Sequence, residues 1–248
     1  MNKKYFYIIL DNLKTIFYAL IIAVLIRSLF FQPFYIPSSS MEPTLLIGDR
    51  IFVSKYTYGY SRHSFPFSLK IFRDRILFKE PKRGDLVVFK TPADNRTDYI
   101  KRLIGMPGDK IQFIDGKIKL NNEFISRKKI NSKNLLIRCG SSNLDADIFE
   151  EFLPNGVSYK AVYKKTGTLM NTDLYIVPKE HYFFLGDNRD CSKDSRYLSS
   201  VGYVKKLNLV GEAEIIFFSN DTIISSMFRF WNLDKSLRLN RFFKKLWY

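Results

Sequence analysis

The sequence has 248 residues, which suits one or two domains and is enough for a sizeable hydrophobic core. Hydrophobic residues make up 46% and charged residues 26%, which excludes a disordered chain. The formal net charge of +16 indicates either a polyanionic partner or lysines spread over solvated faces, and because no nucleic-acid-binding motif is found, we expect no nucleic-acid partner.

The first element is an apolar stretch that we expect to cross a membrane as a helix over residues 15–36, after a tail over residues 1–14. Its one charge, Arg27, lies in the outer part of the span, where an arginine side chain can reach the headgroups. A cleaved secretory signal is the alternative. The stretch leads into FQPFYIP, which is no small-x-small cleavage site, so we favour an uncleaved anchor.

The short tail carries Lys3 and Lys4, and Lys14 lies at its end. Basic residues next to a span favour the inner side of the membrane, so we expect the N-terminus inside. The basic domain that follows does not contradict this orientation, because long domains are translocated largely regardless of charge.

After Pro37 the pattern changes to short apolar runs separated by turn residues, which predicts a mainly β fold, an antiparallel sandwich or barrel. We place the main β domain at 37–120 and 174–225. The more polar stretch 121–173 is predicted to be an inserted smaller β region. The runs that predict strands are 85–90, 99–105, 110–114, 117–120, 159–163, 174–177, 181–186 and 212–219.

The C-terminal residues 226–248 have the pattern of a basic amphipathic helix, which would either lie in a membrane interface or pack on the β domain. The basic, aromatic segment 61–80 has no assigned role, and its contact with the membrane is left open. Cys139 and Cys191 form no CxxC or Cys/His cluster, so we expect no metal site. They could be a disulfide or two free thiols.

Common catalytic motifs are absent: there is no GxSxG, HExxH or Walker loop. A Ser-His-Asp triad would need His63 or His181, and neither has a context typical of a catalytic base. The serine run Ser38–Ser40 is more promising, because Pro37 and Pro43 restrict the backbone on both sides of it. A rigid loop that presents a hydroxyl suits a nucleophile, although three serines are also typical of a flexible linker.

A serine without histidine needs another base, and a lysine can serve when burial lowers its pKa. Lys101 is the candidate. In a strand it would share one face with Tyr99 and Leu103. That context suits a buried base or a charged residue that protects an edge strand, and the stretch itself does not decide.

A third segment, GDNRDCSKDSRY at 186–197, alternates acids and arginines, which suggests a turn stabilised by ion pairs or simply a solvated turn. Together with SSSMEPTLLIGDRIFVSKYTYG, PKRGDLVVFK, YIKRLIGMPGDKI and VGEA, in this order after an apolar span, it strongly resembles the type I signal peptidases of bacteria. These motifs cover about a quarter of the chain.

The resemblance implies a serine endopeptidase with Ser40 as nucleophile and Lys101 as general base, without a cofactor or metal. It implies that Ser192 orients the lysine and that Ser38 contributes to the oxyanion hole. It also implies a largely antiparallel β fold with an inserted second β region, which agrees with the strand pattern. The serine loop departs from many relatives at Ser39 and Glu42, where we expect tolerance.

The substrates would be exported preproteins, cleaved after small residues at −1 and −3, with phospholipid as the surrounding partner. The protein would be a single-pass protein of the bacterial cytoplasmic (inner) membrane with its catalytic domain on the outer, periplasmic side. We expect Ile36, Tyr99 and Ile100 to be pocket walls. The residues expected to form structural ion pairs near the site are Arg102, Asp187, Arg189, Asp194 and Arg196.

Two other functions are considered. A self-cleaving repressor of the LexA type uses similar Ser-Lys chemistry, but it would need an N-terminal DNA-binding domain where this chain has an apolar span. A non-enzymatic, membrane-anchored basic protein would need neither Ser40 nor Lys101.

Overall fold

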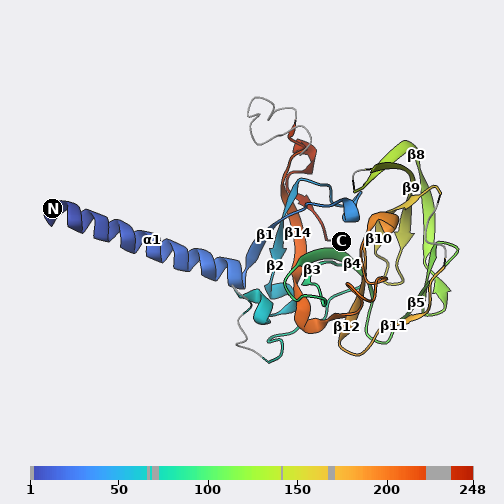
Figure 1. Cartoon of the computed structure of the whole chain (residues 1–248), viewed down its shortest axis with the longest axis horizontal. Helices are drawn as coiled ribbons and strands as arrows, with labels where there is room; N and C mark the ends of the chain where they lie inside the picture. The colour runs from blue at the N-terminus through green and yellow to red at the C-terminus, as the bar shows by residue number, and fades with distance from the viewer. Residues whose placement is uncertain are drawn as a thin grey trace.

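The fold consists of one long N-terminal helix and a β body, as Figure 1 shows. A computed structural model describes residues 3–65, 68, 73–140, 142–166, 171–221 and 236–247. Helix α1, Lys3–Leu29, extends away from the body, and its side chains from Tyr7 to Ile26 are exposed. Residues Tyr7–Leu29 are long and apolar enough to cross a membrane. This is the one such helix in the described part of the chain.

The helix ends earlier than the predicted span 15–36, because residues Phe31–Tyr35 form strand β1. Pro33 lies inside this segment, and a proline has no N–H to donate to a helix. In the structure β1 pairs along its whole length with β2, Asp49–Ser54, and its other edge has no partner strand among the described residues. The apolar pattern therefore continued past the helix into an edge strand.

The main sheet has eight strands in the order β1-β2-β14-β3-β4-β12-β13, with β15 paired to β14. This antiparallel sheet confirms the predicted mainly β fold. Beyond β1 and β2, its strands are β3 (Leu86–Lys90), β4 (Asp98–Gly105), β12 (His181–Leu185), β13 (Val204–Lys205), β14 (Leu209–Ser219) and β15 (Lys244–Lys245).

Two smaller sheets complete the body, and their orders are β10-β9-β8 and β11-β5-β6-β7. The first lies within the predicted insertion 121–173, where only the run at 159–163 was expected to be a strand. These strands are β5 (Lys110–Ile114), β6 (Lys117–Leu120), β7 (Glu123–Phe124), β8 (Ser126–Cys139), β9 (Ser142–Phe152), β10 (Ser158–Lys164) and β11 (Tyr175–Ile176).

The C-terminal segment differs from the predicted helix over 226–248. Residues 222–235 and 248 lie outside the described residues, and in the remainder Leu239–Arg241 form a single 3₁₀ turn before β15. Strand β15 pairs with Ile215 and Ile216 of β14, beyond the residues of β14 that pair with β3. A partner strand there satisfies backbone groups that would otherwise form an open sheet edge.

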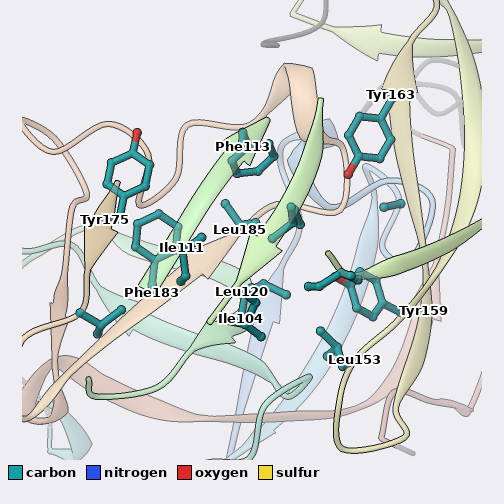
Figure 2. Packing of buried hydrophobic residues seen from close by; sticks show 14 residues of the cluster. Ile104, Ile111, Phe113, Leu120, Leu153, Tyr159, Tyr163, Tyr175, Phe183 and Leu185 are labelled. Atoms are coloured by element: carbon teal, nitrogen blue, oxygen red, sulfur yellow. The ribbon is translucent and has the colours of Figure 1, made fainter. Parts of the chain in front are cut away.

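The largest buried cluster, shown in Figure 2, joins the main sheet to the smaller sheets. Ile104 of β4 and Phe183 and Leu185 of β12 contact side chains of β5, β6 and β10 in it. Leu103, one residue before Ile104, belongs to a separate cluster, as the alternation of a strand requires. Because β4 is fixed by both cores, the residues at its start have a defined position.

Candidate active site

Ser40 lies in a short 3₁₀ helix, Ser39–Met41, that follows β1 directly. Met41 is buried in the core beneath this turn with Ile36 and Leu45, which fixes the serine loop on the body. The loop is also held from the other side, because the backbone N–H of Asn188 donates to the Ser40 carbonyl at 3.1 Å. The Asn188 side-chain amide donates to the Ser39 carbonyl at 3.1 Å. The serine run is therefore a rigid loop and no linker.

The Nζ of Lys101 donates to the Oγ of Ser40 at 2.5 Å. Both side chains are buried, with relative exposures of 4% for Lys101 and 8% for Ser40. Lys101 belongs to β4, which pairs with β3 at residues 98–102 and with β12 from Arg102 onward, so one side of the strand is unpaired by β12 at Lys101 although its side chain is buried. This lysine therefore faces a serine in the interior and is not an exposed charge on an edge strand.

Burial lowers the pKa of the Lys101 ammonium from the ordinary 10.5 to about 8. The carboxylates of Asp194 and Asp187 oppose this shift, but each forms its ion pair with an arginine instead. Lys101 forms no ion pair within the described residues. A large fraction of the amine is therefore neutral in mildly alkaline solution, which is the state that a general base requires.

Ser38 lies on the other side of the nucleophile candidate, with 3.3 Å between its Oγ and the Ser40 Oγ. Ser192 is also buried; its hydroxyl lies near the Asp194 carboxylate and makes no hydrogen bond to the Lys101 ammonium in the described part of the chain. Its Oγ instead lies against Gly186, where an added Cβ would approach to 2.1 Å. The same Cβ would lie 2.5 Å from the Ser40 carbonyl, so only glycine fits at position 186, where the backbone passes close to the serine loop.

The predicted ion pairs are present beside the site. The Arg102 guanidinium donates to both carboxylate oxygens of Asp187, at 2.8 and 2.7 Å. Arg196 binds Asp194 in the same bidentate manner, at 2.8 and 2.9 Å, and Asp194 also accepts from the Gly186 N–H at 3.0 Å. These pairs fix the loop that carries Ser192.

Arg189 pairs with a residue that the sequence analysis missed. Its Nη1 donates to both carboxylate oxygens of Glu151 at 2.7 Å, and both side chains are buried. Tyr159 and Tyr163 donate to the same carboxylate. Glu151 belongs to β9, far from Arg189 in sequence, and no local motif marks it. Asn188 was missed for the same reason, although it lies inside the quoted motif.

The two cysteines form a disulfide between Cys139 of β8 and Cys191, with 5.1 Å between their Cα atoms. This bond decides the alternative that the sequence left open. It attaches the loop of Ser192 to the three-stranded sheet, one residue before that serine.

A cavity of about 440 Å³ opens onto the Ser40–Lys101 pair. The three residues expected to be pocket walls, Ile36, Tyr99 and Ile100, all line it. Neither histidine does so among the described residues. His63 is buried elsewhere, and the ring of His181 contacts the Lys179 carbonyl at 2.7 Å. No group of three or more His, Cys, Asp or Glu side chains that could hold a metal occurs among the described residues.

This geometry agrees with the comparisons with known proteins. The sequence matches the family described as "Signal peptidase, peptidase S26" over residues 9–218. The chain belongs to the S26 signal peptidase family. Its function is that of a signal peptidase, a serine peptidase that cleaves signal peptides.

Several curated relatives are similar over nearly the whole chain. Signal peptidase I of Rickettsia prowazekii is 40% identical, over 93% of this chain and 91% of the relative. Signal peptidase I of Rickettsia massiliae is 42% identical, over 93% and 90%. A solved structure of signal peptidase I from Enterococcus faecalis V583 is 26% identical, covers 54% of this chain and 97% of that chain, and has a TM-score of 0.31.

Membership of the signal peptidase family decides between the functions considered above. A self-cleaving repressor and a non-enzymatic basic protein are both set aside, because the family match spans the apolar helix and the β body together. The apolar helix is the membrane anchor of this peptidase. The Ser40–Lys101 pair stands at the one position in the described structure where a serine hydroxyl contacts a lysine ammonium.

Proposed function

We propose that this peptidase cleaves the signal peptides of exported preproteins with Ser40 as nucleophile and Lys101 as general base. The observation that carries the proposal is the 2.5 Å contact between Ser40 Oγ and Lys101 Nζ inside a buried site. A neutral lysine at this distance accepts the hydroxyl proton as Ser40 attacks the scissile carbonyl. The low pKa of Lys101, about 8, supports this role.

The reaction then follows an acyl-enzyme course. The Lys101 ammonium returns its proton to the leaving amine, and the acyl-ester on Ser40 remains. The neutral amine next takes a proton from water, which attacks the ester carbonyl; the Lys101 ammonium then delivers this proton to the departing Ser40 Oγ, which regenerates the hydroxyl and releases the signal peptide. The Ser38 hydroxyl and the Ser40 N–H would stabilise the oxyanion, at on the order of 3 kcal/mol per donor. The 3.3 Å between the Ser38 and Ser40 oxygens supports the role of Ser38.

Ser192 is proposed to orient the Lys101 amine once substrate is bound. The support is its burial, on a loop that two arginine–aspartate pairs hold in place.

The substrate is proposed to bind as an extended strand between β1 and β4. β1 has an open edge, and the β12 pairing of β4 covers Arg102, Leu103 and Gly105 but not the residues before Arg102. Both segments line the cavity at Ser40. Backbone hydrogen bonds would give affinity, and the walls formed by Ile36, Tyr99 and Ile100 would admit only small side chains at −1 and −3.

The anchor is proposed to cross the bacterial inner membrane once, with the N-terminus in the cytoplasm and the β body on the outer side among phospholipid headgroups. The lysines at the N-terminal end of α1 support this orientation. Strand β1 leads directly from α1 to the loop of Ser40, so the site lies close to the membrane in which the substrate is also anchored.

The test is cleavage of a preprotein by purified full-length enzyme in detergent. Ser40→Ala and Lys101→Ala should each abolish cleavage, and Ser38→Ala should lower kcat by roughly 100-fold with little change in KM. Matched controls are Ser39→Ala, a neighbouring buried serine, and Lys193→Ala, an exposed lysine that lines the same cavity. Undiminished cleavage by Ser40→Ala or by Lys101→Ala would contradict the dyad mechanism.

A further inference from the structure

A second cavity lies between the active site and the end of α1. Its volume is about 140 Å³, and it shares Phe34 and Asp98 with the cavity at Ser40. Most of its other lining side chains are basic or carry a hydroxyl. We call it the basic pocket and define it by Arg27, Ser28, Lys55, His63, Ser68 and Lys90.

The basic pocket has more positive than negative charge. Lys90 is paired with Asp98 at 2.8 Å, which neutralises one of its cations. The Lys55 ammonium is buried and donates to the Ser64 carbonyl at 2.6 Å, and within the described residues neither it nor Arg27 pairs with a carboxylate. Burial, the Arg27 charge and the Lys90 charge lower the pKa of Lys55 to about 8, against the effect of Asp98. An anion in the pocket would reduce the repulsion among these positive charges.

Two hydroxyls in the pocket are available as donors. Arg62 Nε donates to His63 Nε2 at 3.1 Å, so that nitrogen carries no proton and the Nδ1–H donates to the Ser68 Oγ at 3.0 Å. The Ser68 hydroxyl proton is then free to point elsewhere. Ser28 is 3% exposed, and its hydroxyl has no partner in the described part of the chain. Cations and hydroxyl donors around a small cavity form the donor set that a phosphate requires.

Arg27 connects this pocket to an apolar groove of about 730 Å³. The groove is lined by Ala23 and Ile26 of α1 and by aromatic side chains that include Phe31 and Trp247. Strand alternation separates the two sites, because Gln32 and Phe34 line the pocket whereas Phe31 and Pro33 line the groove. An anion site and an apolar groove that meet at the end of a membrane-crossing helix fit one ligand with both properties.

We propose that the basic pocket binds the phosphodiester of an anionic phospholipid whose acyl chains lie along the groove beside α1. A free phosphate would use the pocket but not the groove, and an acidic peptide would have no reason to follow the anchor helix into the membrane. Basic pockets between membrane helices bind anionic headgroups on the cytoplasmic side, and the same charge chemistry would act here at the other end of the helix. The bound lipid would adjoin the active-site cavity through Phe34 and Asp98 and would fix the body against the membrane surface.

In the experiment, the full chain in a non-ionic detergent is titrated with dihexanoyl-phosphatidylglycerol, and the lipid is kept below its own critical micelle concentration. Native mass spectrometry measures the lipid that stays bound. Arg27→Gln should weaken binding about tenfold and Ser28→Ala several-fold. Ser28→Ala should unfold no earlier than wild type in denaturant, because the lost hydroxyl had no partner. Lys117→Gln, which removes an exposed lysine of β6, is the charge-matched control and should bind like wild type.

Equal affinity of wild type, Arg27→Gln and Ser28→Ala would overturn the proposal. So would equally tight binding of inorganic phosphate, which would make this a free-anion site, or of dihexanoyl-phosphatidylcholine, which would indicate partition without recognition. Displacement of the lipid by an acidic peptide would assign the pocket to substrate instead. Cleavage of a short soluble peptide should be the same in wild type and Arg27→Gln, so the outcome is separate from the test of the Ser40–Lys101 mechanism.

Discussion

The guanidinium of Arg102 and the carboxylate of Asp187 form a bidentate ion pair, at 2.8 and 2.7 Å, in which both side chains are completely buried. Arg102 directly follows Lys101 on β4, and Asp187 begins the loop that carries Asn188 and Ser192. Thr44, from the serine loop, donates to the same carboxylate at 2.5 Å. One ion pair therefore joins the three segments that supply the site.

Asp187→Asn should lower the free energy of unfolding by about 3–5 kcal/mol, because it leaves the Arg102 charge buried without its counter-ion. Cleavage should fall as well, since the loop and β4 lose their connection. Chemical denaturation in detergent measures the stability. The matched control is Asp147→Asn, at a half-exposed pair with Lys129, where a loss of no more than about 1 kcal/mol is expected. Similar losses at both sites would contradict the role given to burial.

Gly186→Ala should lower kcat on the order of 100-fold, because the new Cβ would press on the Ser40 carbonyl at 2.5 Å and on the Ser192 hydroxyl. Steady-state cleavage kinetics measure the effect. Gly156→Ala is the control: nothing lies within 4 Å of its Cβ, and it incurs only backbone strain at φ 85°. A Gly186→Ala enzyme with wild-type kcat would show that residue 186 and the Ser40 carbonyl can move apart without loss of activity.

Cleavage should rise with pH through about 8, because Lys101 must be neutral to accept the Ser40 proton. The kcat/KM profile of the free enzyme measures this pKa. A profile that rises near pH 6.5 and is lost in His181→Ala would assign the base to histidine instead.

The same pKa has a consequence for stability. The folded state gives up the Lys101 proton at about pH 8 and the unfolded state at about 10.5, so folding carries the full burial penalty below pH 8. The penalty declines as the pH rises from 8 to 10.5. Lys101→Met should therefore be inactive yet more stable at pH 7, by about 1–3 kcal/mol. Denaturation at pH 7 and at pH 10.5 checks this, and a gain that does not shrink at the higher pH would refute it.

Loss of the Cys139–Cys191 disulfide should lower the free energy of unfolding by about 2–4 kcal/mol, because the bond closes a loop across a sequence separation of 52 residues. Cleavage should weaken too, since Cys191 lines the active-site cavity beside Ser192. After dithiothreitol treatment, chemical denaturation measures the stability and a preprotein cleavage assay measures the activity. The stability and activity of the Cys139→Ala/Cys191→Ala double variant should not respond to the reductant. If dithiothreitol also left the wild-type enzyme unchanged, this disulfide would have no structural role.

The sequence predicted those features that depend on local pattern. Apolar runs identified four of the eight strands of the main sheet, β3, β4, β12 and β14, and the prolines around Ser38–Ser40 predicted a rigid loop. The boundary of the anchor was misplaced because Phe31–Tyr35 is as apolar as the helix before it, and only pairing with β2 makes it a strand. The segment 236–247 was expected to be helical. The prediction was wrong because part of it pairs with β14, a strand from elsewhere in the sequence that leaves no local pattern here.

The same distinction between local pattern and long-range contact applies to the site residues. The strand context made Lys101 a candidate base, but only the family resemblance favoured that role, because burial by other strands and the position of Ser40 are long-range facts. Glu151 could not be predicted at all, since its partner Arg189 is 38 residues away and lies on a different element. Asn188 holds the serine loop through one side-chain and one backbone contact, and neither leaves a pattern in the sequence.

Strand β1 has one more consequence for how the enzyme selects its cleavage position. It is five residues long and directly joins the membrane helix to the serine loop. At about 3.3 Å per residue, this gives a rigid arm of roughly 17 Å. If Ser40 and the orientation act as proposed, this arm would hold the reactive hydroxyl at a set height above the bilayer. A preprotein would be cut at whichever bond reaches that height, so the arm acts as a ruler, and lengthening it would move the cut.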